Sequence, residues 1–171
     1  MRSLDRRALW GLAVAAAVVG LTLATLVIPE GRGRLLIYNG TPSVPLGFYR
    51  RALWQAVEPG VIVALTPPEA ARALGWTEHT LFLKHVVAVA GGRYCITDRE
   101  TTVEGVSYAP PQAESDGRPL PHPTGCATVP PGQVFVLNDV PQSFDSRYFG
   151  PVPVSLITGV YVPLWTFSNS H

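Results

Sequence analysis

A run of twenty-one residues without a charge, Ala8–Ile28, constrains this chain more than any other feature of its sequence. At about 1.5 Å per residue, a helix of this length would be about 30 Å long, the thickness of a bilayer core. A buried helix with no polar face does not suit so small a domain. A cleaved signal peptide has an apolar core of about 7–15 residues and a small-residue cleavage site, which this run does not offer. We therefore expect residues 8–28 to form a transmembrane anchor helix in contact with membrane lipid.

The arginines beside this run indicate its orientation. Three arginines precede the run and two follow it, and the first flank also carries the α-amino group. Because positive charge favours the cytoplasmic side, the sequence predicts a cytoplasmic N-terminus at 1–7. It predicts an external domain at 29–171, and hence a single-pass membrane protein.

Short apolar segments separated by turn residues make up the rest of the chain. Seventeen prolines and sixteen glycines divide it, which is typical of a β-sandwich or barrel. We expect one short helix, Pro67–Leu74, and a proline-rich excursion near 97–128 that is irregular from Pro110 to Thr128. The expected strands are Arg34–Gly40, Gly47–Trp54, Gly60–Leu65, Thr80–Ala90, Arg93–Ile96, Thr101–Val103, Gln133–Leu137 and Leu156–Leu164.

Charge and motif content exclude several classes of function. A net charge of +1 gives no field that would attract nucleic acid. The sequence has no phosphate-binding loop, dinucleotide fingerprint or paired-histidine motif. Its four histidines lack partners at metal-ligand spacing, so we expect neither a metal nor a cofactor. His85 follows Lys84 on an expected strand, would face the opposite side, and is not chosen as a ligand or catalytic residue.

The chain has two cysteines, Cys95 and Cys126. In a domain outside the cytoplasm we expect them to form a disulfide. The alternative is a pair of buried free thiols. Their spacing is not C-x-x-C, which disfavours a redox or zinc site.

Lys84 is the only lysine, and it lies in the apolar segment LFLKHVVAV. An exposed lysine on an edge strand is one interpretation. The other is a desolvated lysine, because burial lowers the pKa of a lysine whereas an arginine stays charged. A neutral amine could act as a general base towards a serine hydroxyl.

Ser43 is a candidate for that hydroxyl. It lies in the loop NGTPSVPLGFYR, which two prolines stiffen and Gly47 allows to bend. Such a loop would fix the hydroxyl and aim the Ser43 backbone N–H at a developing oxyanion. Thr41, two residues earlier, could supply a second donor.

The segment NDVPQSFDSRYFGPV, residues 138–152, places several polar groups among aromatic residues. It includes Ser143, Asp145 and Arg147. A solvated turn with an Asp-capped bend is one interpretation. The other is a support for the site in which an Asp–Arg pair braces the segment that orients the lysine.

These three segments together resemble the membrane-anchored type I signal peptidases. TPSVPLGFYR is similar to the serine motif of that family, LKHVVAVAGG to its lysine motif and SFDSRYFGPV to its last motif. The serine segment and GRPLPHPTGC (Gly117–Cys126) resemble the TraF-like conjugative-transfer peptidases. The resemblance covers nearly the whole chain.

The resemblance implies a signal-peptidase-like β-sandwich or barrel on the periplasmic side of the inner membrane, with one anchor helix. It implies Ser43 as nucleophile, Lys84 as general base and Thr41 as oxyanion donor. It also implies that Ser143 bonds the lysine amine and that Asp145 and Arg147 support the site. One departure is Ala90-Gly91-Gly92, where the family has P-G-D.

The substrate implied by the resemblance is a pilin precursor or a protein bearing a signal peptide, cut by water or joined to an amine of the substrate itself. A general secretory signal peptidase is one alternative. A catalytically inactive, anchored β-domain that serves as a scaffold of a secretion machine is the other.

Overall fold

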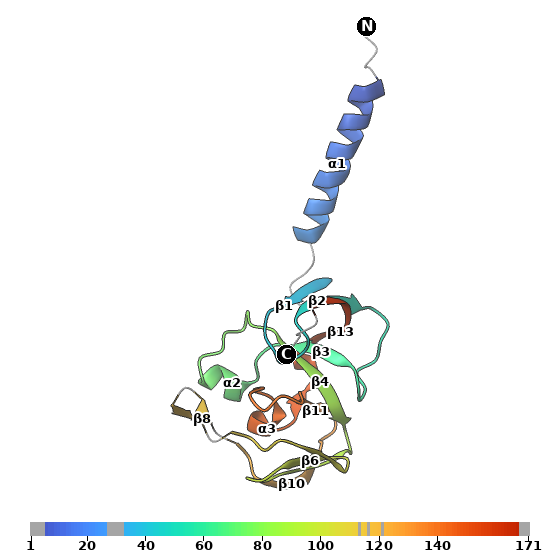
Figure 1. Cartoon of the computed structure of the whole chain (residues 1–171). Coiled ribbons are helices and arrows are strands. Elements are labelled where there is room, and N and C mark those ends of the chain that lie inside the picture. The colour runs from blue at the N-terminus through green and yellow to red at the C-terminus, as the bar shows by residue number, and fades with distance from the viewer. Residues whose placement is uncertain (1–5, 27–32, 113, 116, 121, 168–171) are drawn as a thin grey trace. The chain divides into compact units, whose positions relative to one another are not determined.

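The computed structural model describes residues 6–26, 33–112, 114–115, 117–120 and 122–167 (Figure 1). The chain divides into two compact units, Met1–Arg32 and Gly33–His171.

The first unit contains the helix α1 (Arg6–Leu26). It covers most of the segment expected to be an anchor, while residues 27–28 and most of the expected cytoplasmic segment 1–7 lie outside the described residues. None of the helices in the described ranges combines the length and the apolar character that crossing a membrane requires. The transmembrane role of 8–28 is therefore not confirmed and stays a prediction.

The second unit is built on a seven-stranded antiparallel sheet, with strand order β1-β2-β13-β3-β4-β11-β12. The mostly β fold predicted from the sequence is confirmed. Between residues 33 and 167 this order runs from one edge to the other without closing into a barrel. The strands are β1 (Leu36–Asn39), β2 (Gly47–Ala52), β13 (Ile157–Thr166), β3 (Ile62–Leu65), β4 (Phe82–Val89), β11 (Gln133–Leu137) and β12 (Val152–Pro153).

A four-stranded sheet, in the order β10-β5-β6-β7, lies at the opposite end of this unit from β1 and β2 (Figure 1). Its first two strands place Cys126 opposite Cys95, and the predicted disulfide between them is confirmed. The strands β5 and β6, both expected from the sequence, pair with each other antiparallel. The strands are β10 (Gly125–Thr128), β5 (Arg93–Ile96), β6 (Thr101–Val103) and β7 (Val106–Tyr108), and a separate pair is formed by β8 (Glu114–Ser115) and β9 (Arg118–Pro119).

Hydrophobic clusters cover both faces of the main sheet. Side chains alternate along a strand, so Phe82 and Val86 of β4 pack in one cluster and Leu83 packs in another, with Val44 of the serine loop. The first cluster also takes residues from the short helices α2 (Glu69–Ala73) and α3 (Ser146–Phe149). A 3-10 turn, Val154–Leu156, leads into β13. By this alternation Lys84 belongs to the face of Phe82, and His85 to the face of Leu83.

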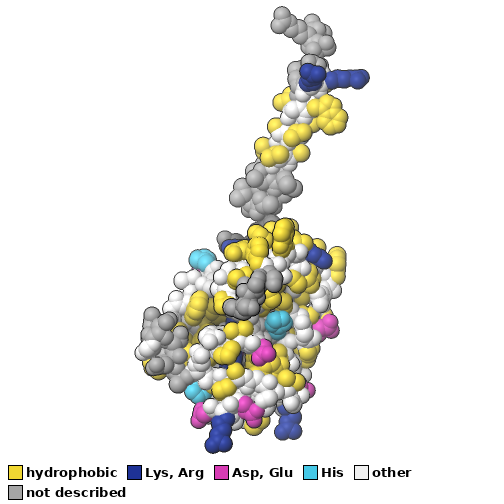
Figure 2. All heavy atoms as spheres, viewed as in Figure 1, with side chains coloured by type: hydrophobic (Ala, Val, Ile, Leu, Met, Phe, Trp, Pro, Cys, Tyr) yellow, Lys and Arg dark blue, Asp and Glu magenta, His cyan; other side chains and the backbone are white. Residues whose placement is uncertain are grey.

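Hydrophobic side chains gather at the end of this unit formed by β1, β2 and β13 (Figures 1 and 2). Tyr38, Phe48 and Trp165 follow one another across these three strands. The rings of Tyr38 and Phe48 are in contact, and Trp165 is 69% exposed. This row of aromatic side chains therefore faces away from the core.

Two segments differ from the expectation. The end of the stretch expected to be irregular, Pro110–Thr128, forms β10, which the disulfide ties to β5. The DSRYF segment forms α3, whose first turn is capped by the Asp145 carboxylate, which accepts from Arg147 N. The solvated-turn interpretation of this segment is wrong, because Asp145 and Arg147 are fully buried.

Candidate active site

The loop between β1 and β2 carries Ser43 and is organised by the side chain of Asn39. The buried Asn39 Nδ2 donates to the carbonyl oxygens of Thr41 at 2.7 Å, Val44 at 2.9 Å and Pro45 at 3.2 Å. The loop backbone therefore wraps around one amide group, which satisfies carbonyls that would otherwise lack a partner.

Gly47 ends this loop where β2 meets β13. Its φ is 147°, and a Cβ at this position would lie 2.1 Å from the carbonyl oxygen of Trp165. The two backbones approach this closely only because position 47 has no side chain.

The hydroxyl of Ser43 lies 3.2 Å from the hydroxyl of Thr41. Thr41 Oγ1 donates its own proton to Asn39 Oδ1 at 3.0 Å. Because a hydroxyl has one proton, Ser43 is the donor in its contact with Thr41. The Thr41 hydroxyl must therefore turn away from Asn39 before it can donate to an oxyanion.

Lys84 is buried on β4, with 3% of its surface exposed. Its amine donates to Ser143 Oγ at 2.7 Å and lies 5.8 Å from the centre of the Phe82 ring. Burial lowers the pKa of this lysine to about 8, against an opposing effect of Asp145 and a smaller lowering by Arg147. The exposed-lysine interpretation is wrong, and the amine is partly neutral near physiological pH.

The segment that holds Ser143 is fixed by a buried ion pair. Arg147 Nε and one terminal nitrogen contact the two carboxylate oxygens of Asp145, each at 2.9 Å. The same terminal nitrogen donates to the carbonyls of Val140 at 2.8 Å and Ser143 at 3.1 Å. The arginine thus sets the backbone that presents Ser143 to the lysine amine.

A cavity of about 620 Å³ opens beside the serine loop. Ser43 lines it, together with His85 of β4; Lys84 does not. Ser43 and Lys84 both lie within the described residues, and no hydrogen bond joins them. The residues that line the cavity are Pro42, Ser43, Val44, Pro45, His85, Asp139, Val140, Thr166 and Phe167.

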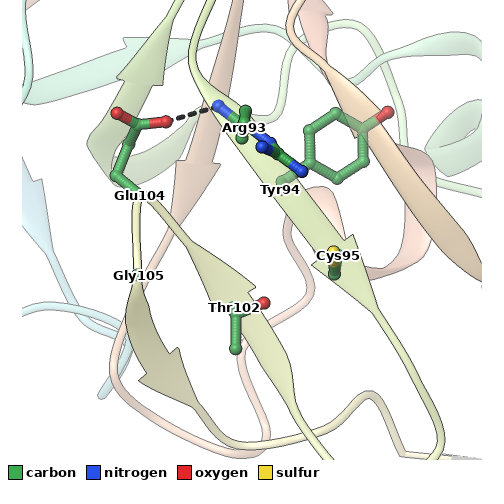
Figure 3. Close-up of a pocket in the computed structure, with 6 residues that line it drawn as sticks. All are labelled: Arg93, Tyr94, Cys95, Thr102, Glu104 and Gly105. Carbon is green, nitrogen blue, oxygen red and sulfur yellow. Dashed lines mark hydrogen bonds between the residues drawn. The ribbon is translucent and has the colours of Figure 1, made fainter.

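Glu104 stands beside the turn in which Gly92 replaces the aspartate of the resembling family. A Cβ at Gly92 would lie 2.9 Å from the Ala88 Cβ and 3.5 Å from the Glu104 carboxylate. That carboxylate accepts the backbone N–H of Arg93, as Figure 3 shows. The turn therefore has an acidic partner, supplied by the two-residue connection between β6 and β7.

Two asparagines that organise the site were missed in the sequence. Asn39 shapes the serine loop, and Asn138 joins β4 to the Ser143 segment through bonds to His85 and the Leu83 carbonyl. An asparagine in a loop usually indicates a turn, so neither asparagine stood out in the sequence as a site residue. The alternate spacing of the polar residues Asn39, Thr41 and Ser43 was the available signal.

Comparison with known proteins gives consistent relatives. The family described as "Signal peptidase, peptidase S26" matches residues 6–165. A conjugal transfer protein TraF of Agrobacterium fabrum is 37% identical, over 88% of this chain and 93% of that protein. A plasmid transfer protein TraF of Escherichia coli is 33% identical, over 75% of this chain and 82% of that protein. Among solved structures, a signal peptidase I of Enterococcus faecalis matches 62% of this chain and 97% of that chain, with 24% identity and a TM-score of 0.40.

Proposed function

The chain belongs to the signal peptidase family, peptidase S26, and we propose that it is a serine peptidase with Ser43 as nucleophile and Lys84 as general base. The observation that carries this proposal is the state of Lys84. The only lysine of the chain is buried, and its pKa is lowered to about 8. An amine with this pKa can accept a proton near neutral pH, which an ordinary lysine does rarely.

The reaction begins with transfer of the Ser43 proton to the neutral amine of Lys84. Ser43 Oγ attacks the carbonyl carbon of the scissile peptide bond, and the C–N bond then breaks as Lys84 returns the proton to the leaving nitrogen. The Ser43 backbone N–H and the Thr41 hydroxyl, once turned from Asn39, stabilise the oxyanion. Water, or an amine of the substrate, then attacks the acyl-enzyme and releases Ser43.

This mechanism requires Ser43 and Lys84 to come into contact when a substrate binds. Ser43 now donates to Thr41, and Lys84 to Ser143. A neutral amine that donates to Ser143 keeps its lone pair available as an acceptor. Hydrogen bonds between catalytic groups commonly tighten only in the substrate complex. By alternation Lys84 belongs to the face of Phe82, whereas the serine loop packs against Leu83 on the other face, so the contact requires a movement of the serine loop as well as of the lysine stem.

The proposed substrate is an extended peptide segment, either a pilin precursor or a presequence, with small residues before the bond that is cut. The names of the relatives, conjugal and plasmid transfer proteins, favour a substrate of conjugative transfer over general secretory proteins. We place the enzyme in the inner membrane with its second unit in the periplasm. The uncharged run 8–28, the disulfide and the exposed aromatic row on β1, β2 and β13 support this location.

Peptide cleavage by the full chain in detergent micelles tests the proposal. Ser43→Ala and Lys84→Arg should each abolish cleavage of internally quenched peptides, because one lacks the nucleophile and the other cannot be deprotonated. Ser155→Ala, at an exposed serine, is the matched control and should cleave normally. Full cleavage by both variants would refute the dyad. A wild type without activity on peptides or on pilin precursors would favour the inactive scaffold. The mass of the product distinguishes the two outcomes: hydrolysis gives a linear peptide, and joining to an amine of the substrate gives a product that is lighter by one water.

A further inference from the structure

His85 and Asp139 line the cavity beside Ser43, and the proposed reaction uses neither. We propose that these residues form a subsite for a positively charged side chain, lysine or arginine, of the peptide substrate. This inference rests on the proposed peptidase function and adds a charge preference to it.

The hydrogen bonds of Asn138 determine the tautomer of His85. Asn138 Oδ1 accepts the backbone N–H of His85 at 3.0 Å, so the amide oxygen faces the histidine. The same oxygen lies 3.0 Å from His85 Nδ1. An amide oxygen can only accept, so Nδ1 carries the proton. In the neutral ring Nε2 is then an acceptor, and it has no hydrogen-bond partner within the described residues.

Asp139 supplies the negative charge of the cavity. It is exposed, and it is the one residue with a formal charge among the nine that line the cavity. Its field extends beyond its own segment, because it adds to the effect of burial in raising the pKa of Tyr108. The described lining contains no lysine or arginine that would neutralise it.

Phe167 adds an aromatic surface to the same cavity. Phe167 is 45% exposed, and its backbone N–H donates to the Leu46 carbonyl at 2.8 Å, which holds this residue against the serine loop. The face of an aromatic ring attracts cations. A carboxylate, a neutral imidazole nitrogen and an aromatic ring are together complementary to an ammonium or guanidinium group, whose N–H groups are all donors.

Paired peptides test this subsite in the full chain. In each pair, one position near the scissile bond carries either lysine or norleucine, which has a similar straight-chain stem without the charge. We expect one position at which lysine raises kcat/KM about tenfold over norleucine, mainly through KM, as hydrogen bonds to charged groups do. Asp139→Asn and His85→Phe should each lower this ratio severalfold. Asp98→Asn is the control: it removes the same charge from an exposed side chain beside His122, and it should keep the wild-type ratio of lysine to norleucine cleavage.

The outcomes separate the subsite from the proposed function. A ratio near one at every position, with the norleucine peptides still cut, overturns the subsite and leaves the peptidase intact. A ratio that Asp139→Asn and His85→Phe do not change also overturns it. If neither peptide of any pair is cut by the wild type, the peptidase function and the subsite fail together.

Discussion

Lys84 Nζ donates a 2.7 Å hydrogen bond to Ser143 Oγ, and the carbonyl of the same Ser143 accepts from Arg147 at 3.1 Å. The buried amine is therefore oriented by a segment that a second buried cation holds in place. Asp145 pairs directly with Arg147 and opposes the fall in the lysine pKa. The lysine remains basic enough to accept a proton and is not fixed in its charged form.

Peptide cleavage should rise with pH through the lysine pKa. The protonated amine cannot act as a base, so kcat/KM should increase towards a midpoint near pH 8 and level off above it. The measurement is a pH–rate profile with a neutral peptide. Lys84→Arg should stay inactive at every pH. A rate that follows an ordinary lysine, or does not change with pH, would contradict the assignment.

Replacement of Lys84 by methionine should stabilise the protein at neutral pH. The folded protein lowers the lysine pKa from 10.5 to about 8, so between these values the unfolded chain binds more protons and the stability of the wild type rises with pH. The advantage of Lys84→Met over the wild type should therefore be smaller at pH 10 than at pH 7, by roughly 2 kcal/mol. Urea unfolding of both proteins at the two pH values measures this difference. An advantage that is equal at both would show that the lysine is not desolvated.

Arg147→Lys should destabilise the fold although it keeps the charge. Lysine cannot make the two-pronged contact with the Asp145 carboxylate or reach the same carbonyls. We expect a loss of about 3–5 kcal/mol, as for the breaking of other buried ion pairs, measured by denaturant unfolding. Arg93→Lys, at an exposed arginine, should change stability by less than about 0.5 kcal/mol. Equal effects of the two substitutions would contradict the bracing role.

Asn39→Asp should be more harmful than Asn39→Ala. Alanine leaves loop carbonyls without a donor, at about 1–3 kcal/mol, whereas aspartate also places a carboxylate against the carbonyls of Thr41, Val44 and Pro45. Both variants should lose peptide cleavage, because the loop no longer holds Ser43. Unfolding and cleavage assays measure the two effects, with exposed Gln55→Glu as the control for the same amide-to-acid change. If Asn39→Asp equals that control, the amide does not organise the loop.

Much of the site could be predicted because its residues are unusual where they occur. A single lysine in an apolar strand has few explanations, and the structure places it in contact with Ser143 as the family resemblance implied. The strands β3 and β4 were predicted because their runs of β-branched, apolar residues are typical of buried strands.

The remaining features depend on contacts between distant segments. The strand β10 follows a proline-rich stretch, and its pairing with β5 could not be deduced from local sequence. His85 was not chosen as a site residue. The alternation of side chains predicted that it faces the side of β4 opposite to Lys84, but it could not predict that the serine loop packs on that side.

The Gly92 turn receives an acidic group from another segment of the chain. Ala88 leaves no room for a side chain at position 92, and Glu104 brings its carboxylate beside the turn from the connection between β6 and β7. The two positions are therefore one structural unit, and a substitution at either has to be interpreted with the other.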